Sequence, residues 1–416
     1  MKITIINTSD INGGAALAGF AIFNAIGRFT KIEPRIVCGS KFSNYENIAT
    51  ITGRKIRFID NLVNDLIIKQ TIGQSYWLPS KNRILEHRFI KDTDLINIHN
   101  AHGNYLAYPV IGKLAKIAPV VISMHDMWYL TGHCGYAFEC NRYQSFCHKC
   151  PDLNAYPALK HDTAHFHWKK KKKLYKNKNI HFVTSSDWLR KEAESTQLFE
   201  GKKIDKIYNP INTEILKTRN KKNVRELLDI PSDKNIICFG AADIGSERKG
   251  FPSFIENIDN IFIKENNIYL LLMGKDGQNL LDKLPSWLPF KYFGSIQNPE
   301  FRSLVYNASD VFIFPTLAEN LPNMILEAMS SGTPCVTFNV GGCREIVHNG
   351  ITGYLAKPND FKDFIHGIRL LLKDQNQRTD LSQNSRRFII ENFSYKNCAE
   401  KYATLFYAIH KKFHST

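Results

Sequence analysis

The sequence predicts an α/β protein built from two doubly wound parallel sheets, and three observations support this fold class. The chain has 416 residues, which exceeds one ordinary hydrophobic core and suits two domains of about 200 residues each. In both halves, short apolar runs alternate with segments of helical spacing, as strands and crossover helices do in parallel sheets. A polar, irregular stretch from Asn209 to about Asn223 separates the halves and predicts a domain junction.

In the N-terminal half, five apolar runs have the length of buried strands. They are residues 3–7, 35–38, 95–99, 120–124 and 180–184. Helical spacing covers residues 15–29 and 105–116. Gly13 and Gly14 stand between the first strand and the first helix but do not form the G-x-G-x-x-G fingerprint of a dinucleotide site. They either allow a ligand to approach the backbone closely or form an ordinary tight turn.

The C-terminal half repeats the same alternation more clearly. The predicted strands are residues 236–240, 269–273, 291–294, 311–315 and 334–338. The predicted helices are residues 252–262, 299–308, 322–331, 361–372, 377–392 and 395–413. Ligands of doubly wound sheets bind beyond the carboxyl ends of the strands, so a protein with two such domains is expected to hold its ligand in a central cleft.

The composition excludes several classes of protein. Apolar residues make up 43% and charged residues 23% of the chain, which is normal for a folded domain. No apolar run approaches the ~20 residues needed to span a bilayer, so the cytoplasm is the expected location. The formal net charge is +16, and Lys169–Lys173 concentrates part of it. This run is either a solvated helix face or a patch for anionic lipid at the inner face of the membrane. Nucleic acid is not expected as a partner, because no recognition module is present.

Two glutamates eight residues apart, Glu319 and Glu327, flank a predicted strand-to-helix turn. Pro322 fits the first turn of that helix, so one carboxylate precedes the helix and the other lies about two turns further on. The backbone N–H groups of a helix N-terminus attract phosphate. Carboxylates that accept hydroxyl protons beside an anion site suit a nucleotide-sugar, which is part polyol and part diphosphate. Chance glutamates on a solvated face are the alternative.

Two adjacent cations, Arg248 and Lys249, follow a predicted strand in the same half. Fixed cations there would stabilise the negative charge that builds on a diphosphate leaving group. An ordinary surface pair is the alternative, and the glutamate pair favours the functional interpretation. His125 follows the predicted strand 120–124, where an imidazole can bind a sugar hydroxyl or share developing positive charge near an anomeric carbon. A structural loop histidine is the alternative there.

Four of the nine cysteines fall within 17 residues: Cys134, Cys140, Cys147 and Cys150. Only the last pair has the tight C-x-x-C spacing. In a reducing compartment such a group suggests a structural zinc loop, because four thiolates form a tetrahedral zinc site. Free or redox-active thiols are the alternative.

These motifs together resemble the retaining glycosyltransferases of family 4, which have the GT-B fold of two Rossmann-like domains facing a central cleft. The stretch from Glu319 to Glu327 resembles the E-x7-E motif of the family, and residues 246–250 resemble its diphosphate-binding loop. Further resembling segments are residues 339–347 and 349–355.

The resemblance covers about residues 235–395 well and the N-terminal half thinly. There it rests on Gly13, Gly14 and His125, and residues 125–132 with the cysteines look like a subgroup of bacterial exopolysaccharide and lipopolysaccharide assembly. The family implies three segments. They are an acceptor-binding domain over residues 1–210, a nucleotide-sugar-binding domain over 211–394, and a last helix over 395–416 that crosses back to the first domain.

The resemblance also implies a role for each matching residue. Arg248 and Lys249 hold the donor diphosphate, and Glu327 accepts the ribose hydroxyls. Glu319 accepts hydroxyls of the donor sugar and orients its ring. The remaining positions are amides near Asn320, Leu321 and Asn323, the backbone of Gly14 beside the phosphate, and His125 at the sugar face.

The expected function is that of a retaining glycosyltransferase in surface polysaccharide biosynthesis. It would move a hexosyl unit from a UDP- or GDP-sugar to a saccharide acceptor, with a lipid-linked saccharide favoured. No convincing D-x-D motif is present, because Asp92-Thr93-Asp94 precedes a strand, and this agrees with a metal-independent GT-B enzyme that needs no cofactor for catalysis. The alternatives are a GT-B-type nucleotide-sugar 2-epimerase and a non-catalytic sugar-nucleotide-binding protein.

Overall fold

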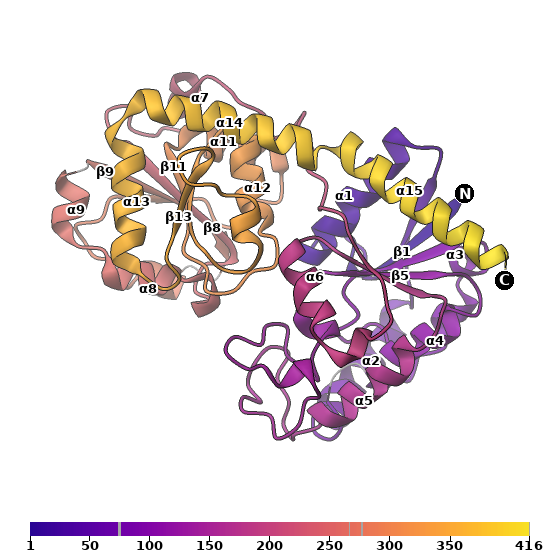
Figure 1. Cartoon of the computed structure of the whole chain (residues 1–416). Helices are drawn as coiled ribbons and strands as arrows, with labels where there is room; N and C mark the ends of the chain where they lie inside the picture. The colour runs from indigo at the N-terminus through magenta and orange to yellow at the C-terminus, as the bar shows by residue number, and fades with distance from the viewer. Residues whose placement is uncertain (74–75, 266, 276–277, 416) are drawn as a thin grey trace. The chain divides into compact units, whose positions relative to one another are not determined.

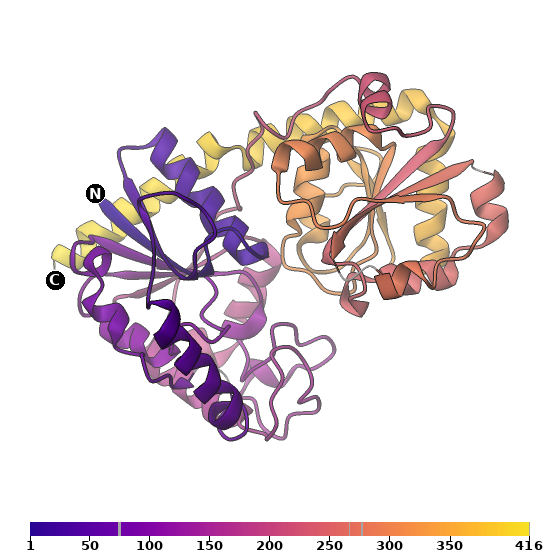
Figure 2. The same ribbon diagram turned by 180° about the vertical axis from the view of Figure 1, so that it is seen from behind.

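The computed structural model describes residues 1–73, 76–265, 267–275 and 278–415, and the chain divides into two compact units (Figure 1). One unit comprises Met1–Pro210 with Tyr395–Thr416, and the other is Ile211–Ser394. Each unit contains a parallel sheet with helices on its faces, seen from the opposite side in Figure 2. The predicted fold class, two Rossmann-like α/β domains, is confirmed.

The described strands of the first unit form a seven-stranded parallel sheet in the order β3-β2-β1-β4-β5-β6-β7. They are β1 Lys2–Ser9, β2 Glu33–Ser40, β3 Ile48–Thr50, β4 Leu95–Ile98, β5 Val120–Met124, β6 Ile180–Thr184 and β7 Ile204–Lys206. The five predicted strands are all present. The sequence did not reveal β3 and β7, because three residues are too few to show an apolar run. The strand order reverses between β1 and β4, which is where such sheets bind ligands.

Helices, most of them short, join these strands. They are α1 Gly14–Phe29, α2 Arg54–Val63, η1 Asn64–Ile68, η3 Arg83–Glu86, α3 Arg88–Lys91, η4 Tyr108–Val110, α4 Ile111–Leu114, η5 Met127–Tyr129, η6 Arg142–Gln144, α5 Ala164–Tyr175, α6 Asp187–Glu194 and η7 Gln197–Phe199. The predicted helix over 105–116 was too long. The helical part begins only at Tyr108, with η4 followed directly by α4. Pro109 lies in the first turn of η4, where its missing N–H costs nothing.

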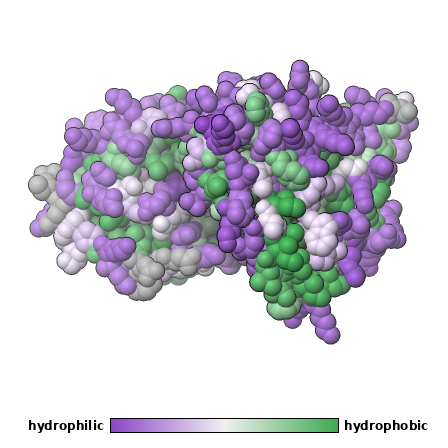
Figure 3. Space-filling model, turned by 90° about the horizontal axis from the view of Figure 1, so that it is seen from below, coloured by the Kyte–Doolittle hydropathy of each residue, from purple (hydrophilic) through white to green (hydrophobic). Residues whose placement is uncertain are grey.

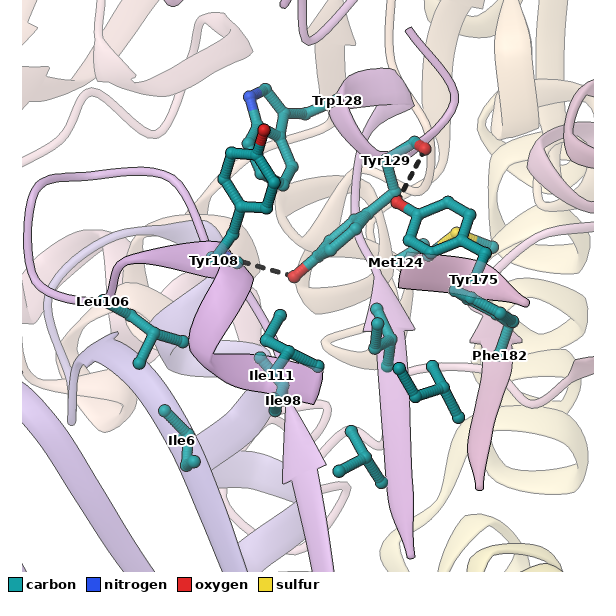
Figure 4. Close-up of a cluster of buried hydrophobic side chains, with 14 of the residues drawn as sticks. Ile6, Ile98, Leu106, Tyr108, Ile111, Met124, Trp128, Tyr129, Tyr175 and Phe182 are labelled. Carbon is teal, nitrogen blue, oxygen red and sulfur yellow. Dashed lines mark hydrogen bonds between the residues drawn. The ribbon is translucent and has the colours of Figure 1, made fainter. Parts of the chain in front are cut away.

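Aromatic side chains fill much of the core on one face of this sheet. Figure 4 shows Tyr108, Trp128, Tyr129 and Tyr175 gathered over β4, β5 and β6. The hydroxyl of Tyr175 donates to the backbone oxygen of Tyr129 at 2.9 Å, so the polar end of this ring is satisfied inside the core.

The last helix of the chain, α15 Tyr395–His414, packs against α1 in this unit (Figure 1). Its buried residues recur every three or four positions, which places them on one face. They are Cys398, Ala399, Tyr402, Ala403, Phe406 and Ile409. All of these except Cys398 share a hydrophobic cluster with Ile22 and Phe23 of α1.

In the second unit the described strands form a six-stranded parallel sheet in the order β10-β9-β8-β11-β12-β13. They are β8 Asn235–Asp243, β9 Ile268–Lys275, β10 Phe290–Tyr292, β11 Val311–Phe314, β12 Cys335–Phe338 and β13 Gly353–Ala356. The order reverses between β8 and β11. The five predicted strands are present, and β13 was not predicted.

The described helices of this unit are α7 Lys221–Leu227, η8 Glu247–Lys249, α8 Phe251–Asn257, α9 Asn260–Glu265, α10 Gln278–Leu281, α11 Pro299–Ala308, α12 Asn323–Ser330, η9 Gly341–Glu345, α13 Phe361–Lys373 and α14 Gln375–Phe393. The five helices predicted in this unit all lie where helices occur, whereas α7, η8, α10 and η9 were not predicted. The single helix predicted over 252–262 is two helices. Ile258 is extended between them, and the carboxylate of Asp259 accepts from Phe262 N at 2.6 Å. Among the described residues, no helix is long and apolar enough to cross a bilayer.

Candidate functional site

The predicted donor-site residues gather at the point in the second sheet where the strand order reverses. Arg248 and Lys249 lie in η8, in the loop that follows β8. Glu319 follows β11, the strand that pairs with β8 in parallel. Loops after two neighbouring parallel strands emerge at the same edge of the sheet, and a reversal of strand order opens a crevice between them. The fold therefore explains why segments 70 residues apart meet.

One carboxylate oxygen of Glu319 holds both cations. Its Oε1 lies 2.7 Å from Nη1 of Arg248 and 2.5 Å from Nζ of Lys249. Arg248 Nη1 also donates to the backbone oxygen of Ala318 at 2.6 Å. The side chain of Glu319 is 9% exposed and that of Lys249 is 17% exposed, so the three charges form a compact and mostly buried cluster.

Charge and burial act against each other on these groups. Burial raises the pKa of Glu319, but Lys249 and Arg248 lower it further, so the net pKa lies below its ordinary value. Burial lowers the pKa of Lys249 and outweighs the opposite effect of Glu319. Glu319 is therefore ionised at neutral pH, and its cations are held beside it with little water around them.

Two glycines fix the loops that carry this cluster. Gly250 has a φ of +74°, and a Cβ there would lie 1.8 Å from the carbonyl oxygen of Pro315. Gly341 has a φ of +51°, and a Cβ there would lie 1.7 Å from the carbonyl oxygen of Glu319. Gly342 N donates to that oxygen at 3.2 Å. Only glycine permits both the conformation and the close approach, so Gly341 sets the backbone of Glu319 and Gly250 that of Pro315, four residues before it.

Glu327 is held by a different cation, which the sequence did not reveal. Nε and Nη2 of Arg302 each donate to one of its carboxylate oxygens at 2.9 Å, and the Tyr306 hydroxyl donates to Oε2 at 3.1 Å. Arg302 and Tyr306 are one turn apart on α11, so both face α12. A carboxylate offers about four acceptor positions, and these contacts use two on Oε2 and one on Oε1. Glu327 Oε1 retains capacity for a further donor such as a ribose hydroxyl.

The segment between the glutamates is buried and leads into α12. Asn320 is 2% exposed and Leu321 is 7% exposed. The helix α12 begins at Asn323, and Pro322 immediately precedes it. The prediction had placed Pro322 in the first turn of the helix. In the described residues no side chain caps α12 at Pro322. The first turn of α12 thus supplies backbone N–H groups of the kind that bind phosphate.

In the first unit, the predicted residues lie after β1 and β5. Gly13 has a φ of +102°, and Gly14 begins α1. A Cβ added at Gly14 would meet none of the described atoms within 4 Å. The space at the Cβ position of Gly14 is therefore open among the described residues.

His125 belongs to a chain of hydrogen bonds that fixes its protonation. Asn97 Nδ2 donates to Val121 O at 3.0 Å, so its Oδ1 accepts from His99 Nε2 at 2.9 Å. His99 Nδ1 is then the acceptor for His125 Nε2, at 2.7 Å. Burial lowers the pKa of His125 to about 4, which Asp126 partly offsets. His125 is thus a neutral imidazole at neutral pH, with its Nδ1 as the acceptor nitrogen.

The cysteine loop does not form a metal site by its own geometry. His133 Nε2 lies 3.2 Å from Cys150 Sγ, but within the described ranges no three His, Cys, Asp or Glu side chains are grouped to hold a metal ion. Burial raises the pKa of Cys134 to about 12 and that of Cys147 to about 11. Cys134 and Cys147 are therefore protonated thiols at neutral pH. The structural zinc remains a prediction that metal analysis of protein purified without chelator can test.

The basic run Lys169–Lys173 is not one solvated face, which corrects part of the prediction for it. Lys171 is 1% exposed. Its Nζ donates to Trp128 O and to Thr131 O, and it lies 3.6 Å from the centre of the Trp128 ring. This lysine anchors the loop after β5 to α5 and cannot reach a surface partner, whereas Lys169, Lys170 and Lys173 are exposed.

A cavity of about 530 Å³ lies at the opposite edge of the second sheet, near the residues that precede β8, β11 and β12. Two of its cations are already paired, because Lys221 and Arg225 both bind Asp310, at 2.7 Å and 2.6 Å. It is at the amino ends of the strands, where doubly wound sheets do not hold their ligands, and we do not assign the donor to it.

Known proteins resemble this chain in sequence and in fold. Residues 220–388 match the family model described as glycosyl transferases group 1. The chain is 30% identical over 155 residues, 35% of its length and 39% of the relative's, to the capsular polysaccharide biosynthesis glycosyltransferase CapM of Staphylococcus aureus. It is 34% identical over 102 residues, 24% of its length and 26% of the relative's, to the Escherichia coli UDP-Gal:alpha-D-GlcNAc-diphosphoundecaprenol alpha-1,3-galactosyltransferase. The chain thus spans well under half the length of these two curated relatives.

The solved structures establish the fold over the whole chain. The crystal structure of Anabaena Alr3699/HepE in complex with UDP-glucose is similar to this chain over 100% of both chains, with a TM-score of 0.65 and 15% sequence identity. At this identity the likeness concerns the fold. The chain has the GT-B fold, and its segment 220–388, which carries Arg248, Lys249, Glu319 and Glu327, matches the group 1 glycosyl transferases.

Proposed function

We propose that this protein is a retaining, metal-independent glycosyltransferase that transfers a hexosyl unit from a UDP- or GDP-sugar to a saccharide acceptor in surface polysaccharide biosynthesis. The observation that carries the proposal is the convergence of Arg248 and Lys249 on Glu319 at the reversal of strand order. The match to group 1 glycosyl transferases and the relatives named for capsule synthesis support it.

In this proposal the cations bind the diphosphate of the donor. As the bond between the anomeric carbon and the diphosphate oxygen breaks, negative charge grows on the leaving oxygens. Arg248 and Lys249 are already held in place by Glu319, so they stabilise this charge without reorganising. The acceptor hydroxyl forms the new bond on the same face of the sugar, and its proton passes to the departing phosphate oxygen.

The two glutamates recognise the rest of the donor. Glu319 is ionised and accepts hydroxyl protons of the sugar, which orients the ring. Glu327 accepts a ribose hydroxyl through the remaining capacity of Oε1, while Arg302 fixes its position. The backbone near Asn320, Leu321 and Asn323 completes the pocket.

Residues of the first unit act on the sugar and the acceptor in this proposal. The backbone of Gly14 approaches the donor phosphate, and His125 Nδ1 accepts from a hydroxyl at the sugar face. A lipid-linked saccharide is the favoured acceptor, and the relative named for a diphosphoundecaprenol substrate supports it. The protein would then work in the cytoplasm, peripherally at the inner face of the membrane.

A panel of nucleotide-sugars tests this function with purified protein and a lipid-linked acceptor. We expect transfer from one UDP- or GDP-sugar with retention at the anomeric carbon, undiminished by chelator. Glu319→Ala and Lys249→Ala should each abolish most of it. Lys362→Ala removes an exposed cation on α13 in the same unit and is the matched control.

The assay also separates the two alternatives. An epimerised donor formed without any acceptor would identify the 2-epimerase. Tight donor binding with neither transfer nor hydrolysis would identify a binding protein. Unaffected turnover in Glu319→Ala would refute the assignment of the site.

A further inference from the structure

The helix formed by α2 and its continuation η1 turns its apolar side to the outside. Five large apolar side chains along it are between 47% and 69% exposed. They are Phe58 at 69%, Ile59 at 50%, Leu62 at 47%, Leu66 at 65% and Ile67 at 53%. Their spacing places most of them on one face, since residues three or four apart are neighbours on a helix. We call these five residues the α2 face. Figure 3 shows a large apolar area at the end of the first unit where α2 lies in Figures 1 and 2.

The opposite side of the same helix faces the domain, and two of its three buried residues are polar, Ile68 being the third. Asp60 is 4% exposed and Asn64 is 1% exposed. The Asp60 carboxylate accepts from Ser80 N at 3.0 Å and from the Ser80 hydroxyl. A helix on a protein surface ordinarily buries its apolar stripe and solvates its polar one. Here polar contacts attach the helix, so the α2 face does not contribute to the core and stands available for a partner.

Cations lie toward both ends of the α2 face. Arg54 and Lys55 are exposed at the start of α2. At the other end, exposed Lys160 donates to Gln70 at 2.6 Å, and Lys170 lies 5.8 Å from the Tyr76 ring.

The acidic groups of this helix are already engaged. Asp65 pairs with Lys69 at 2.6 Å, and Asp60 is buried on Ser80. The start of α5 is tied to the chain after η1, because Thr163 Oγ1 donates to Ile72 O at 2.6 Å. The exposed lysines of α5 therefore border the same surface.

We propose that the α2 face is the surface by which this protein binds an anionic phospholipid bilayer. An apolar helix face bordered by cations lies in the plane of the interface, with its apolar side chains among the acyl chains and its cations on the lipid phosphates. Trp77 is 38% exposed and lies three residues before Ser80, which binds Asp60 of α2. Lys81 Nζ lies 5.2 Å from the centre of its ring, and this is the amphipathic pairing that the headgroup layer accommodates.

Membrane binding by the α2 face does not depend on the proposed enzymatic function. It places the main membrane contact on the α2 face instead of the Lys169–Lys173 run. The basic run Lys169–Lys173 is an accessory, since Lys171 is buried. The main contact is apolar and comes from a segment whose sequence gave no such indication.

Cosedimentation with vesicles tests the proposal, using the full-length protein and vesicles of phosphatidylglycerol mixed with phosphatidylcholine. The wild type should bind these vesicles. The double variant Phe58→Ser/Leu66→Ser should bind at least about tenfold more weakly, because two exposed anchors are lost. Leu227→Ser removes a side chain that is 69% exposed in the second unit and should bind as the wild type does. Both changed positions are exposed, and circular dichroism checks that the fold is kept.

The charge requirement is tested separately with Arg54→Gln/Lys55→Gln. Binding to the mixed vesicles should fall about fivefold for each charge removed, and the wild type should bind pure phosphatidylcholine weakly. Equal binding by the wild type and Phe58→Ser/Leu66→Ser would overturn the proposal. So would a wild-type dimer that this double variant converts to a monomer, because a second copy would then cover the α2 face.

Discussion

Glu319 Oε1 lies within 2.7 Å of both Arg248 Nη1 and Lys249 Nζ, so a single oxygen balances two cations. A diphosphate that binds these cations must compete with Glu319 for them. The carboxylate therefore has two opposing effects. It fixes the cations in position, and it weakens their attraction for any anion that arrives.

This relationship predicts opposite effects of Glu319→Gln on binding and on transfer. The amide keeps the size of the side chain but loses the charge, so UDP or GDP alone should bind about fivefold more tightly, a difference of about 1 kcal/mol. Transfer should fall by about a hundredfold or more, because the sugar loses its ionised acceptor. Calorimetry with the free nucleotide and a transfer assay measure the two effects.

Lys249→Ala is the companion variant, and it should weaken both nucleotide binding and transfer. If Glu319→Gln weakened UDP binding as much as Lys249→Ala does, the carboxylate would act only as an anchor for the cations.

The ion pair between Arg302 and Glu327 predicts a large loss of stability for Arg302→Met. This change leaves a carboxylate mostly buried without its cation, which costs about 3–5 kcal/mol. Arg387→Met on α14 removes an exposed arginine and should cost less than about 1 kcal/mol. Urea unfolding followed by tryptophan fluorescence and circular dichroism compares the two.

The double variant Arg302→Met/Glu327→Met should recover much of that loss, since apolar side chains of similar volume replace buried ion pairs well. A double variant as unstable as Arg302→Met alone would show that the loss has another origin. Neither variant should retain tight donor binding, because both lose the placement of the Glu327 carboxylate.

Gly341 gives a prediction about activity rather than stability. In Gly341→Ala the new Cβ would meet the carbonyl oxygen of Glu319 at 1.7 Å, so the Glu319 backbone must move and transfer should fall at least about tenfold. Gly350→Ala is the matched control, because Gly350 also has a positive φ, +73°, but no described atom lies within 4 Å of its added Cβ. It should cost about 1 kcal/mol of stability and leave transfer unchanged. Equal turnover in the two variants would contradict the role given to Gly341.

The site residues that could be predicted from the sequence are those that follow a predicted strand. Arg248, Lys249 and Glu319 each follow an apolar run, and parallel topology brings the ends of such runs to one edge of the sheet. Arg302 could not be predicted, since it lies in the middle of a helix and pairs with Glu327 only because α11 packs against α12. Nothing local to Arg302 distinguishes it from a solvated arginine.

The fold shows the same division between local and tertiary information. The helix at α11 was predicted with the bounds it has, Pro299–Ala308. Its local sequence agrees with this start, because proline suits the first helical position and the side chain of Asn298 accepts from Glu300 N. The helix α7, which begins at the end of the predicted junction, was missed although Asn220 caps it. The α2 face would be assigned to the core by its apolar spacing, and only the contacts of Asp60 reveal the opposite orientation.

The hydrogen-bond chain through His125 predicts how the stability of the first unit depends on pH. Burial lowers the pKa of His125 in the folded protein to about 4, below the ordinary value of about 6.5 that applies in the unfolded chain. Between these values the unfolded state binds the proton and the folded state does not. The stabilisation is therefore complete above pH 6.5 and is lost as the pH falls towards 4.

In His125→Gln the side chain can still donate to His99 Nδ1 but cannot take up a proton. The loss of unfolding free energy between pH 6.5 and 4 should therefore be smaller in this variant than in the wild type, with the remainder arising from other buried groups such as His99, whose pKa burial also lowers. His161→Gln changes an exposed histidine in the same unit and should follow the wild type. Urea unfolding at pH 7, 5.5 and 4.5 measures all three, and parallel curves for the wild type and His125→Gln would mean that His125 titrates in the folded protein as it does in the unfolded chain.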